Sequence, residues 1–227
     1  MDLDSSTRTA LITGGSAGLG RALTRALAAD GWHVITDARD GARLAGAGLP
    51  ESVAAIPGDI TDADHRAALV AAVVARGRLD LLVHNASTLG PTPMRTLAEA
   101  DPDDLHDVWR TNVAAPLALT GGLLGWLRTN NGVLVGISSD AAVNHYETWG
   151  LYGASKAALD HLVLTYAAEA GVTAYAVDPG DMRTAMHQDA FPGEDISDRP
   201  LPETVVPAFL RLLGRRPSSG RYRAEDL

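Results

Sequence analysis

The sequence predicts a doubly wound parallel α/β sheet with three α/β/α layers, formed by a single domain over residues 1–227. Three observations lead to this fold class. Short apolar and β-branched segments alternate with helix-patterned segments along the chain. The first of them runs straight into a glycine-rich turn and a helix, which is how a parallel βαβ unit opens. No internal repeat, low-complexity tract or domain boundary interrupts the 227 residues, a length typical of one domain.

Four strands are predicted in the N-terminal half. Segment 9–13 is short, apolar and β-branched, and after the glycine turn Leu19, Leu23 and Leu27 recur at helical steps. This helix is expected to end at Asp30-Gly31, a usual C-terminal stop. The further predicted elements are strands at 32–37, 53–57 and 79–84 and an amphipathic helix at 62–76.

The C-terminal half continues the alternation. Asp101-Pro102 has the N-cap and first-turn residues that start a helix, and this helix is expected to reach about Leu127. The further predicted elements are strands at 132–137, 172–177 and 220–223, helices at 150–169 and 203–213, and a loop at 178–202. Ligands of such sheets bind beyond the C-terminal ends of the strands. The polar segments that follow the strands therefore predict one crevice, made by 14–20, 37–41, 58–62, 84–93, 138–150 and 178–202.

Composition excludes several function classes. The chain has 28 acidic and 19 basic residues, a net charge of −9, so no nucleic-acid partner is expected. It has no cysteine, which excludes disulfides, thiolate zinc sites and cysteine nucleophiles. The seven histidines are scattered, and no metal site is expected. A polar N-terminus and the lack of a long uncharged run predict a cytoplasmic protein without a membrane partner.

A glycine-rich turn follows the first strand. Its glycines in the segment 13–20 are spaced G-xxx-G-x-G, and small residues there let backbone N–H groups approach a pyrophosphate at the N-terminus of a helix. The alternative interpretation is a plain glycine turn.

Tyr152 and Lys156 form the second motif. Lys156 is the only lysine among the 19 basic residues, and it lies four residues after Tyr152 on the same face of a predicted helix. A phenol with an ordinary pKa of about 10 needs its anion stabilised before it can exchange protons at neutral pH, and an ammonium one turn away does so. The alternative is a tyrosine packed against a lysine stem.

Together these motifs resemble the short-chain dehydrogenase/reductase family, which has a single-domain Rossmann fold and a Tyr-xxx-Lys pair. The resemblance runs from the loop at Thr13 to the Asp-Pro-Gly segment at Asp178. In the family a serine precedes the tyrosine by thirteen residues, as Ser139 precedes Tyr152, with Ser138 as the weaker candidate.

The resemblance implies hydride transfer between a nicotinamide and a carbonyl carbon, with Tyr152 giving or taking the proton. Ser139 would polarise the substrate oxygen. Lys156 would hold the nicotinamide ribose and lower the pKa of Tyr152. Asn112 would anchor a water in the proton relay, whereas by itself it would be interpreted as a solvent-facing helical residue.

The resemblance also implies cofactor contacts at the ends of several strands. The implied cofactor-binding residues are Gly14, Ser16, Gly18, Leu19, Arg39, Asp59, Ile60, Asn85, Ala86, Tyr152, Lys156, Pro179, Gly180, Met182 and Thr184. Helix capping by Asp59 and a simple turn at Pro179 are alternatives that can coexist with binding.

The end of the second strand favours NADP(H) over NAD(H). NAD-preferring relatives place an acid there, whereas NADP users place an arginine just beyond it. The acid position holds Ala38, and Arg39 follows. Asp37 is one residue too early, but a shift of one residue in strand register would reverse the preference because strand side chains alternate faces. NAD(H) therefore stays open.

The sequence departs from the family at three places that bear on substrate shape and subunit packing. Ser87 replaces the glycine of the Asn-Asn-Ala-Gly motif, the usual glycine is missing from 140–142, and the Asp-Gly-Gly ending is absent. The residues expected to contact the substrate are Ser139, His145, Tyr146, Trp149 and Tyr152, with loop 181–202 as a lid. The alternative for that loop is a solvated segment.

The predicted function is NADPH-dependent reduction of a ketone or aldehyde to an alcohol, carried out by Asn112, Ser139, Tyr152 and Lys156. Two alternatives remain: an NAD-dependent alcohol dehydrogenase working oxidatively, and a non-catalytic dinucleotide-sensing protein. Relatives pair through two long helices, here around 104–127 and 150–169, so a homodimer or homotetramer is expected.

Overall fold

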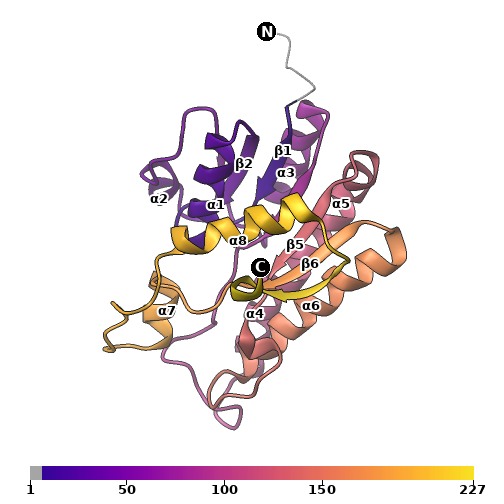
Figure 1. Ribbon diagram of the computed structural model, residues 1–227. Helices are drawn as coiled ribbons and strands as arrows, with labels where there is room; N and C mark the ends of the chain where they lie inside the picture. The colour runs from indigo at the N-terminus through magenta and orange to yellow at the C-terminus, as the bar shows by residue number, and fades with distance from the viewer. Residues whose placement is uncertain (1–6) are drawn as a thin grey trace.

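The computed structural model describes residues 7–227 and contains one seven-stranded, fully parallel sheet in the order β3-β2-β1-β4-β5-β6-β7 (Figure 1). The predicted single α/β domain of the doubly wound type is confirmed. The strands are β1 (Thr9–Ile12), β2 (His33–Ala38), β3 (Ala54–Pro57), β4 (Leu81–His84), β5 (Val133–Ile137), β6 (Thr173–Asp178) and β7 (Gly220–Arg223). Residues 1–6, which carry most of the polar N-terminus, lie outside the described residues.

Helices cover both faces of the sheet. On one face α1 (Gly18–Ala29) packs against α8 (Pro202–Arg215), which crosses the sheet in yellow in Figure 1. On the other face lie α3 (Ala63–Arg76), α5 (Ala115–Thr129) and α6 (Gly150–Ala170). In β1, the Ile12 side chain packs in the hydrophobic core on the side of α1 and α8, and its neighbour Leu11 packs in the core on the side of α3, α5 and α6. Because both faces are covered, the central strands β1, β4 and β5 are buried along their whole length rather than at alternate residues.

The order of the strands reverses next to β1, and this is where the site lies. After β3 the chain returns and places β4 on the other side of β1. The loops that follow β1 and β4 meet there: Asn85 Nδ2 donates to the carbonyl oxygen of Thr13 at 2.8 Å, and the Thr13 hydroxyl accepts from the amide of Ala86 at 3.0 Å. A reversal of this kind opens a crevice at the C-terminal ends of the strands.

Some elements differ from the sequence-based expectation. The long helix expected from Asp101 is interrupted: α4 (Pro102–Trp109) runs into a π-helical turn, Arg110–Ala114, before α5 begins. Asp101 is its N-cap, as predicted, and forms a capping box with Asp104. The segment expected to be a loop contains α7 (Ala185–Ala190), at the end of the sheet where α4 also lies (Figure 1).

Four short pieces complete the chain, of which none was predicted. They are α2 (Gly41–Ala45), α7 as given above, and the 3-10 turns Asp140–Ala142 and Ala224–Asp226. Along residues 7–227, no helix has the length and apolar character that crossing a membrane requires.

Candidate active site

A cavity of about 840 Å³ opens at the C-terminal ends of the strands. Most of the predicted site residues line it, and they come from seven separate stretches of the chain. Those on the cavity wall are Gly14, Ser16, Gly18, Leu19, Arg39, Asp59, Ile60, Asn85, Ala86, Ser139, Trp149, Tyr152, Lys156, Pro179, Gly180, Met182 and Thr184. Asn112, His145 and Tyr146 do not line it.

The glycine turn leaves the N-terminus of α1 open to the cavity. Gly14 has a φ of +77°, which only glycine adopts without strain, and a Cβ at Gly20 would lie 2.3 Å from the Gly14 carbonyl oxygen. The residue before the helix, Ala17, makes no side-chain cap, so the first-turn N–H groups have no such partner. This arrangement suits an anionic group at the helix end.

Asp37, near the end of β2, is buried and both of its carboxylate oxygens have partners inside the fold. One carboxylate oxygen accepts the Gly14 N–H at 2.8 Å, and the other lies 2.9 Å from Nε2 of His65. Asp37 is 1% exposed, whereas Arg39 is exposed at the cavity wall. Both oxygens of Asp37 therefore already have partners inside the fold.

Positive charge gathers on the side of the cavity next to β2 and β3. Arg39, Arg43 of α2 and Arg110 of the π turn all line this side, around Asp59. Partial burial acts to raise the pKa of Asp59, but hydrogen bonds from Thr61 and the charges of Arg39 and Arg110 outweigh it and hold that pKa below its usual value. Asp59 also accepts the Thr61 N–H at 2.8 Å, but it does not cap the next helix, because the N-cap of α3 is Asp62.

Tyr152 and Lys156 lie buried on one face of α6. Lys156 Nζ donates to the carbonyl oxygen of Ile137 at 2.9 Å and lies 5.4 Å from the centre of the Tyr152 ring. Burial lowers the pKa of Lys156 to about 8, although the charge of Asp160 opposes this. Burial also raises the pKa of Tyr152 well above its usual value, against hydrogen bonding with Ser139 and Ser87. The phenol is therefore held in its protonated form, which is opposite to the lowering of the Tyr152 pKa that the resemblance implies.

Asn112 is buried in the π turn rather than facing solvent. Its Nδ2 donates to the Thr88 carbonyl oxygen and to Ser155 Oγ, each at 2.9 Å. Its Oδ1 accepts from the amide of Thr88 at 2.9 Å and from Ser87 Oγ at 3.2 Å. The side chain thus ties the loop after β4 to α6, and its role in a proton relay stays a prediction.

The two serines after β5 have different partners. Ser138 Oγ donates to Asp160 Oδ2 at 2.7 Å, in the interior. Ser139 Oγ accepts from the amide of Ala141 at 3.2 Å and donates to Asp140 Oδ1 at 3.1 Å. Because Ser138 is held by a carboxylate on α6, Ser139 is the serine available to a ligand.

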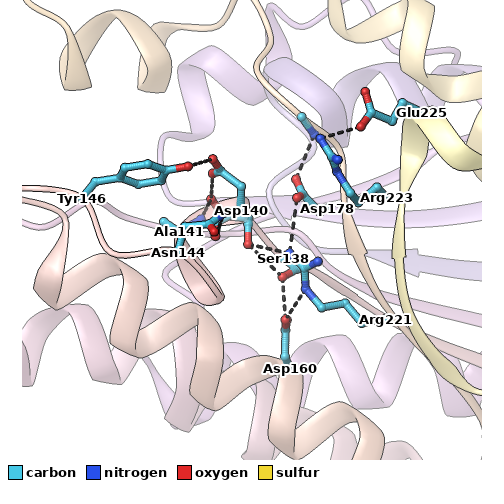
Figure 2. Close-up of polar contacts among 12 residues, drawn as sticks. Ser138, Asp140, Ala141, Asn144, Tyr146, Asp160, Asp178, Arg221, Arg223 and Glu225 are labelled. Carbon is cyan, nitrogen blue, oxygen red and sulfur yellow. Dashed lines mark hydrogen bonds and ion pairs between the residues drawn. The ribbon is translucent and has the colours of Figure 1, made fainter.

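Arg221 of β7 holds three parts of the site together, as Figure 2 shows. Its Nε lies 3.2 Å from Asp160 Oδ2, and its Nη2 lies 2.8 Å from the Ser139 carbonyl oxygen and 3.3 Å from Asp178 Oδ2. The other oxygen of Asp178 accepts the Gly180 N–H at 3.0 Å. One guanidinium therefore fixes α6, the serine segment and the start of the Pro-Gly loop relative to one another.

Sequence reasoning did not find Arg221 or Asp160. Asp160 follows Lys156 by four residues, so the helical spacing that located Tyr152 was also a signal for Asp160. Nothing local indicates Arg221, because its partners are 43 and 61 residues away in the chain.

The expected substrate residues are only partly brought together. Trp149 lines the cavity, with its ring 5.7 Å from that of Tyr152 and 5.8 Å from that of Phe191. His145 is exposed and does not reach the cavity. Tyr146 reaches it only through Asp140, to which its hydroxyl donates at 2.7 Å. Within residues 7–227 no group of three or more His, Cys, Asp or Glu side chains is placed to hold a metal ion.

Known proteins resemble this chain over most of its length. Residues 8–195 match the short chain dehydrogenase family. The chain is 37% identical over 141 residues to the uncharacterized oxidoreductase YciK of Escherichia coli K12, which covers 60% of this chain and 55% of that protein. It is 34% identical over 183 residues to serine 3-dehydrogenase of Agrobacterium fabrum, and the match covers 78% of this chain and 72% of that protein. The chain spans about half the length of the first curated relatives that it matches.

The fold has a similar counterpart among solved structures. A chain described as a short chain dehydrogenase from Shigella flexneri 2a, complexed with NADP, superposes with a TM-score of 0.88 at 29% identity. The superposition covers 99% of this chain and 100% of that one.

Proposed function

This chain belongs to the short-chain dehydrogenase family, and from that premise we propose that it is an NAD(P)-dependent oxidoreductase that reduces a ketone or aldehyde to an alcohol with NADPH. One observation carries the proposal: a buried Tyr152 and Lys156, one helical turn apart, line the same cavity as Ser139 and the uncapped N-terminus of α1. A chain that only sensed a dinucleotide would have no use for an acid, its electrostatic support and a hydroxyl donor at one place.

The residues of the cavity fit a dinucleotide. The turn at the start of α1 needs glycine at Gly14 and Gly20, since a Cβ there would lie within 2.9 Å of atoms of Asn85 or of the turn itself. The helix end would hold the pyrophosphate, and Asp59 and Ile60 would border the adenine. Lys156 would hold the nicotinamide ribose, and Gly180, Met182 and Thr184 would border the nicotinamide.

NADP(H) is the better match for the charges next to β2. A 2′-phosphate would meet Arg39, with Arg43 and Arg110 close by, whereas Asp37 is already bonded to Gly14 and His65. The similar Shigella flexneri chain is complexed with NADP, which supports the same preference.

The reaction would use groups that are already in position. The bound cofactor supplies a hydride to the carbonyl carbon. Ser139 Oγ donates a hydrogen bond to the carbonyl oxygen, and Tyr152 gives that oxygen its proton. The Lys156 ammonium stabilises the phenolate that remains. General acids of this kind contribute roughly 10²–10⁴ in rate.

Further features of the proposal concern the lid, the assembly and the location. The loop 181–202 brings α7 to the cavity, where Met186 and His187 line the wall, and we assign this loop as the lid over the substrate.

Leu105, Trp109 and Leu117 of α4 and α5 are 38%, 43% and 47% exposed, which supports a homo-oligomer formed through these helices. A cytoplasmic location stays a prediction.

Replacement of Tyr152 by Phe tests the function directly. We expect Y152F to lose carbonyl reduction by about 10²-fold or more while NADPH binding, followed by fluorescence titration, changes little. Tyr166→Phe is the matched control, since Tyr166 lies on the same helix, outside the cavity, and should keep full activity. Unchanged turnover in Y152F would contradict the proposal. A wild-type protein that binds NADPH but reduces no carbonyl compound and oxidises no alcohol would favour the sensing alternative.

A further inference from the structure

Asp140 places a carboxylate beside the serine that would hold the substrate oxygen. Its Oδ1 accepts from Ser139 Oγ at 3.1 Å and its Oδ2 from the Tyr146 hydroxyl at 2.7 Å, and Figure 2 shows the Tyr146 hydroxyl directed at it. Asp140 lines the cavity and is only partly exposed. Any substrate oxygen bound to Ser139 therefore lies next to this carboxylate.

The charge of Asp140 is not compensated within the protein. Its two hydroxyl partners are neutral, and it takes part in none of the ion pairs found among residues 7–227. Two other carboxylates on this side of the cavity differ: Asp178 is paired with Arg221, and Asp181 lies 3.8 Å from Arg199. Asp189 is likewise in none of these ion pairs, but the carboxylate bonded to Ser139 Oγ is that of Asp140. A ligand with a positive charge would supply the partner that Asp140 lacks.

Cations are distributed unevenly along the cavity. The three arginines that line it lie on the side of β2 and β3. On the side of β5 and β6, the charged and titratable lining groups are Asp140, Asp178, Asp181, Asp189, His187, Tyr152 and Lys156. Lys156 is deeply buried with its Nζ on the Ile137 carbonyl, and His187 lies 3.8 Å from Asp181. A carboxylate or phosphate on the substrate would find no exposed lysine or arginine on that wall.

Asp140 also competes with the substrate oxygen for the hydrogen bond that Ser139 donates. Ser139 has one hydroxyl hydrogen, and it is directed at Asp140. A substrate cation bound to Asp140 would take over this carboxylate and release the hydrogen for the substrate oxygen. The rest of the wall here is apolar, with Leu89, Trp149 and Met186, so the remainder of the substrate would be small and uncharged.

The distance between Ser139 Oγ and the Asp140 carboxylate indicates where on the substrate the positive charge would lie relative to the reacting oxygen. Ser139 Oγ and Asp140 Oδ1 are one hydrogen-bond length apart. In a vicinal amino alcohol the oxygen and nitrogen on neighbouring carbons have a similar separation, so each can meet its own partner. We propose that the substrate carries an ammonium group on the carbon next to the reacting one, as in an α-amino ketone or the corresponding 1,2-amino alcohol, and that Asp140 binds this group.

This inference rests on the proposed function and specifies its substrate class. In the oxidative direction the carbinol hydrogen would leave as hydride to NADP⁺, and the O–H proton would pass to the phenolate form of Tyr152, which the Lys156 ammonium stabilises, so the alcohol would become a ketone. The ammonium keeps its bonds and its charge throughout.

Three alcohols of the same shape and different charge test it. 1-Amino-2-propanol, 2-butanol and lactate share a CH₃–CH(OH) unit and carry a cation, no charge and an anion on the next carbon. With NADP⁺ at neutral pH we expect kcat/KM for the amino alcohol to exceed that for 2-butanol by about tenfold or more, and lactate to be the poorest. In D140N the ratio of amino alcohol to 2-butanol should fall by about tenfold. Asp189→Asn, which removes another lining carboxylate, should keep the wild-type ratio.

A binding measurement separates this inference from the proposed function. Saturation-transfer NMR of 1-amino-2-propanol, with 2-butanol as reference, should show contact with the wild-type protein and much weaker contact with D140N. An equal kcat/KM for the two alcohols, or a ratio unaffected by D140N, overturns the inference and leaves the function standing. If the wild-type protein turns over no alcohol or ketone, the proposed function fails, and the inference then stands if the NMR contact depends on Asp140 and falls if it does not.

Discussion

Asp37 and His65 form a buried pair in which Oδ2 lies 2.9 Å from Nε2. His65 belongs to α3 and occupies the space beside Gly58, where a Cβ would lie 2.1 Å from its ring. The other oxygen of Asp37 holds the Gly14 amide. The acid at the end of β2 therefore supports the glycine turn from inside, and the neighbouring Arg39 is left to face the cavity.

The first prediction concerns the choice of cofactor. Arg39→Ala should weaken NADPH binding by roughly 10–100-fold, because a hydrogen bond to a charged group is worth about 1.5–3 kcal/mol. NADH binding should change little, since NADH has no 2′-phosphate. Fluorescence titration with both cofactors measures the difference, and Arg25→Ala on the exposed side of α1 is the control.

Asp37→Ala should affect the two cofactors equally, unlike Arg39→Ala. Because Asp37 supports the turn that would hold the pyrophosphate, its loss should weaken NADPH and NADH binding alike. A selective loss of NADH binding in this variant would mean that Asp37, not Arg39, contacts the adenosine ribose.

The second prediction concerns the stability supplied by Arg221. Arg221→Met leaves Asp160 and Asp178 without their guanidinium, and their side chains are only 11% and 5% exposed. Breaking a buried ion pair by removing one partner costs about 3–5 kcal/mol, and since Arg221 is itself partly exposed we expect about 3 kcal/mol. Urea unfolding measures this loss.

Arg223 is the matched control on the same strand. It pairs with Glu225 at the surface, and both side chains are more than half exposed, so Arg223→Met should cost less than about 1 kcal/mol. Equal losses in the two variants would show that Arg221 does not hold the site together.

The third prediction concerns the pH dependence of carbonyl reduction. Burial lowers the pKa of Lys156 to about 8 and the Asp160 carboxylate opposes that shift, so activity that needs the ammonium should decline as pH rises through about 8. In Asp160→Asn the opposing charge is gone. The pKa of Lys156 should then fall further and the alkaline limb of kcat/KM should move to lower pH, by about one pH unit.

The profile is measured from pH 6 to 10 with NADPH and a carbonyl substrate. Asparagine can still accept the hydrogen bond from Ser138, so the change is mainly one of charge. Asp189→Asn removes a carboxylate from the cavity wall without touching α6 and should leave the limb in place. A limb at the same pH in D160N would show that Asp160 does not act on Lys156.

The elements that could be predicted from the sequence are those set by local patterns. The parallel sheet follows from its apolar central strands, and the pairing of Tyr152 with Lys156 follows from their spacing of four residues, whereas Ser139 is implied only by the family resemblance. Asp101 was recognised as an N-cap because its proline and acidic neighbours are adjacent in the chain. In each case the physical cause lies within a few residues.

The features that were missed depend on distant or weak signals. The π turn interrupts a helix at Asn112, whose partners come from the loop after β4 and from α6. α7 is only six residues long, and its one local signal is Thr184, whose hydroxyl accepts the His187 N–H at 3.1 Å. Arg221 meets its carboxylates only after the sheet has formed. Tertiary contacts, which spacing does not contain, decide all three.

The last prediction concerns stability in acid. His84, the last residue of β4, is 3% exposed and its Nε2 lies 2.7 Å from Thr120 Oγ1, and burial lowers its pKa from 6.5 to about 3. Between these two values the unfolded chain binds a proton at this residue and the folded chain does not, so folding stability falls as pH drops below 6.5. At pH 4.5 the loss from this group should be about 2–3 kcal/mol relative to pH 7.5. Urea unfolding of wild type, His84→Gln and the exposed His106→Gln at both pH values isolates this contribution. The loss of stability between pH 7.5 and pH 4.5 should be smaller by about 2–3 kcal/mol in H84Q alone. An equal loss in all three proteins would show that His84 takes up its proton without unfolding.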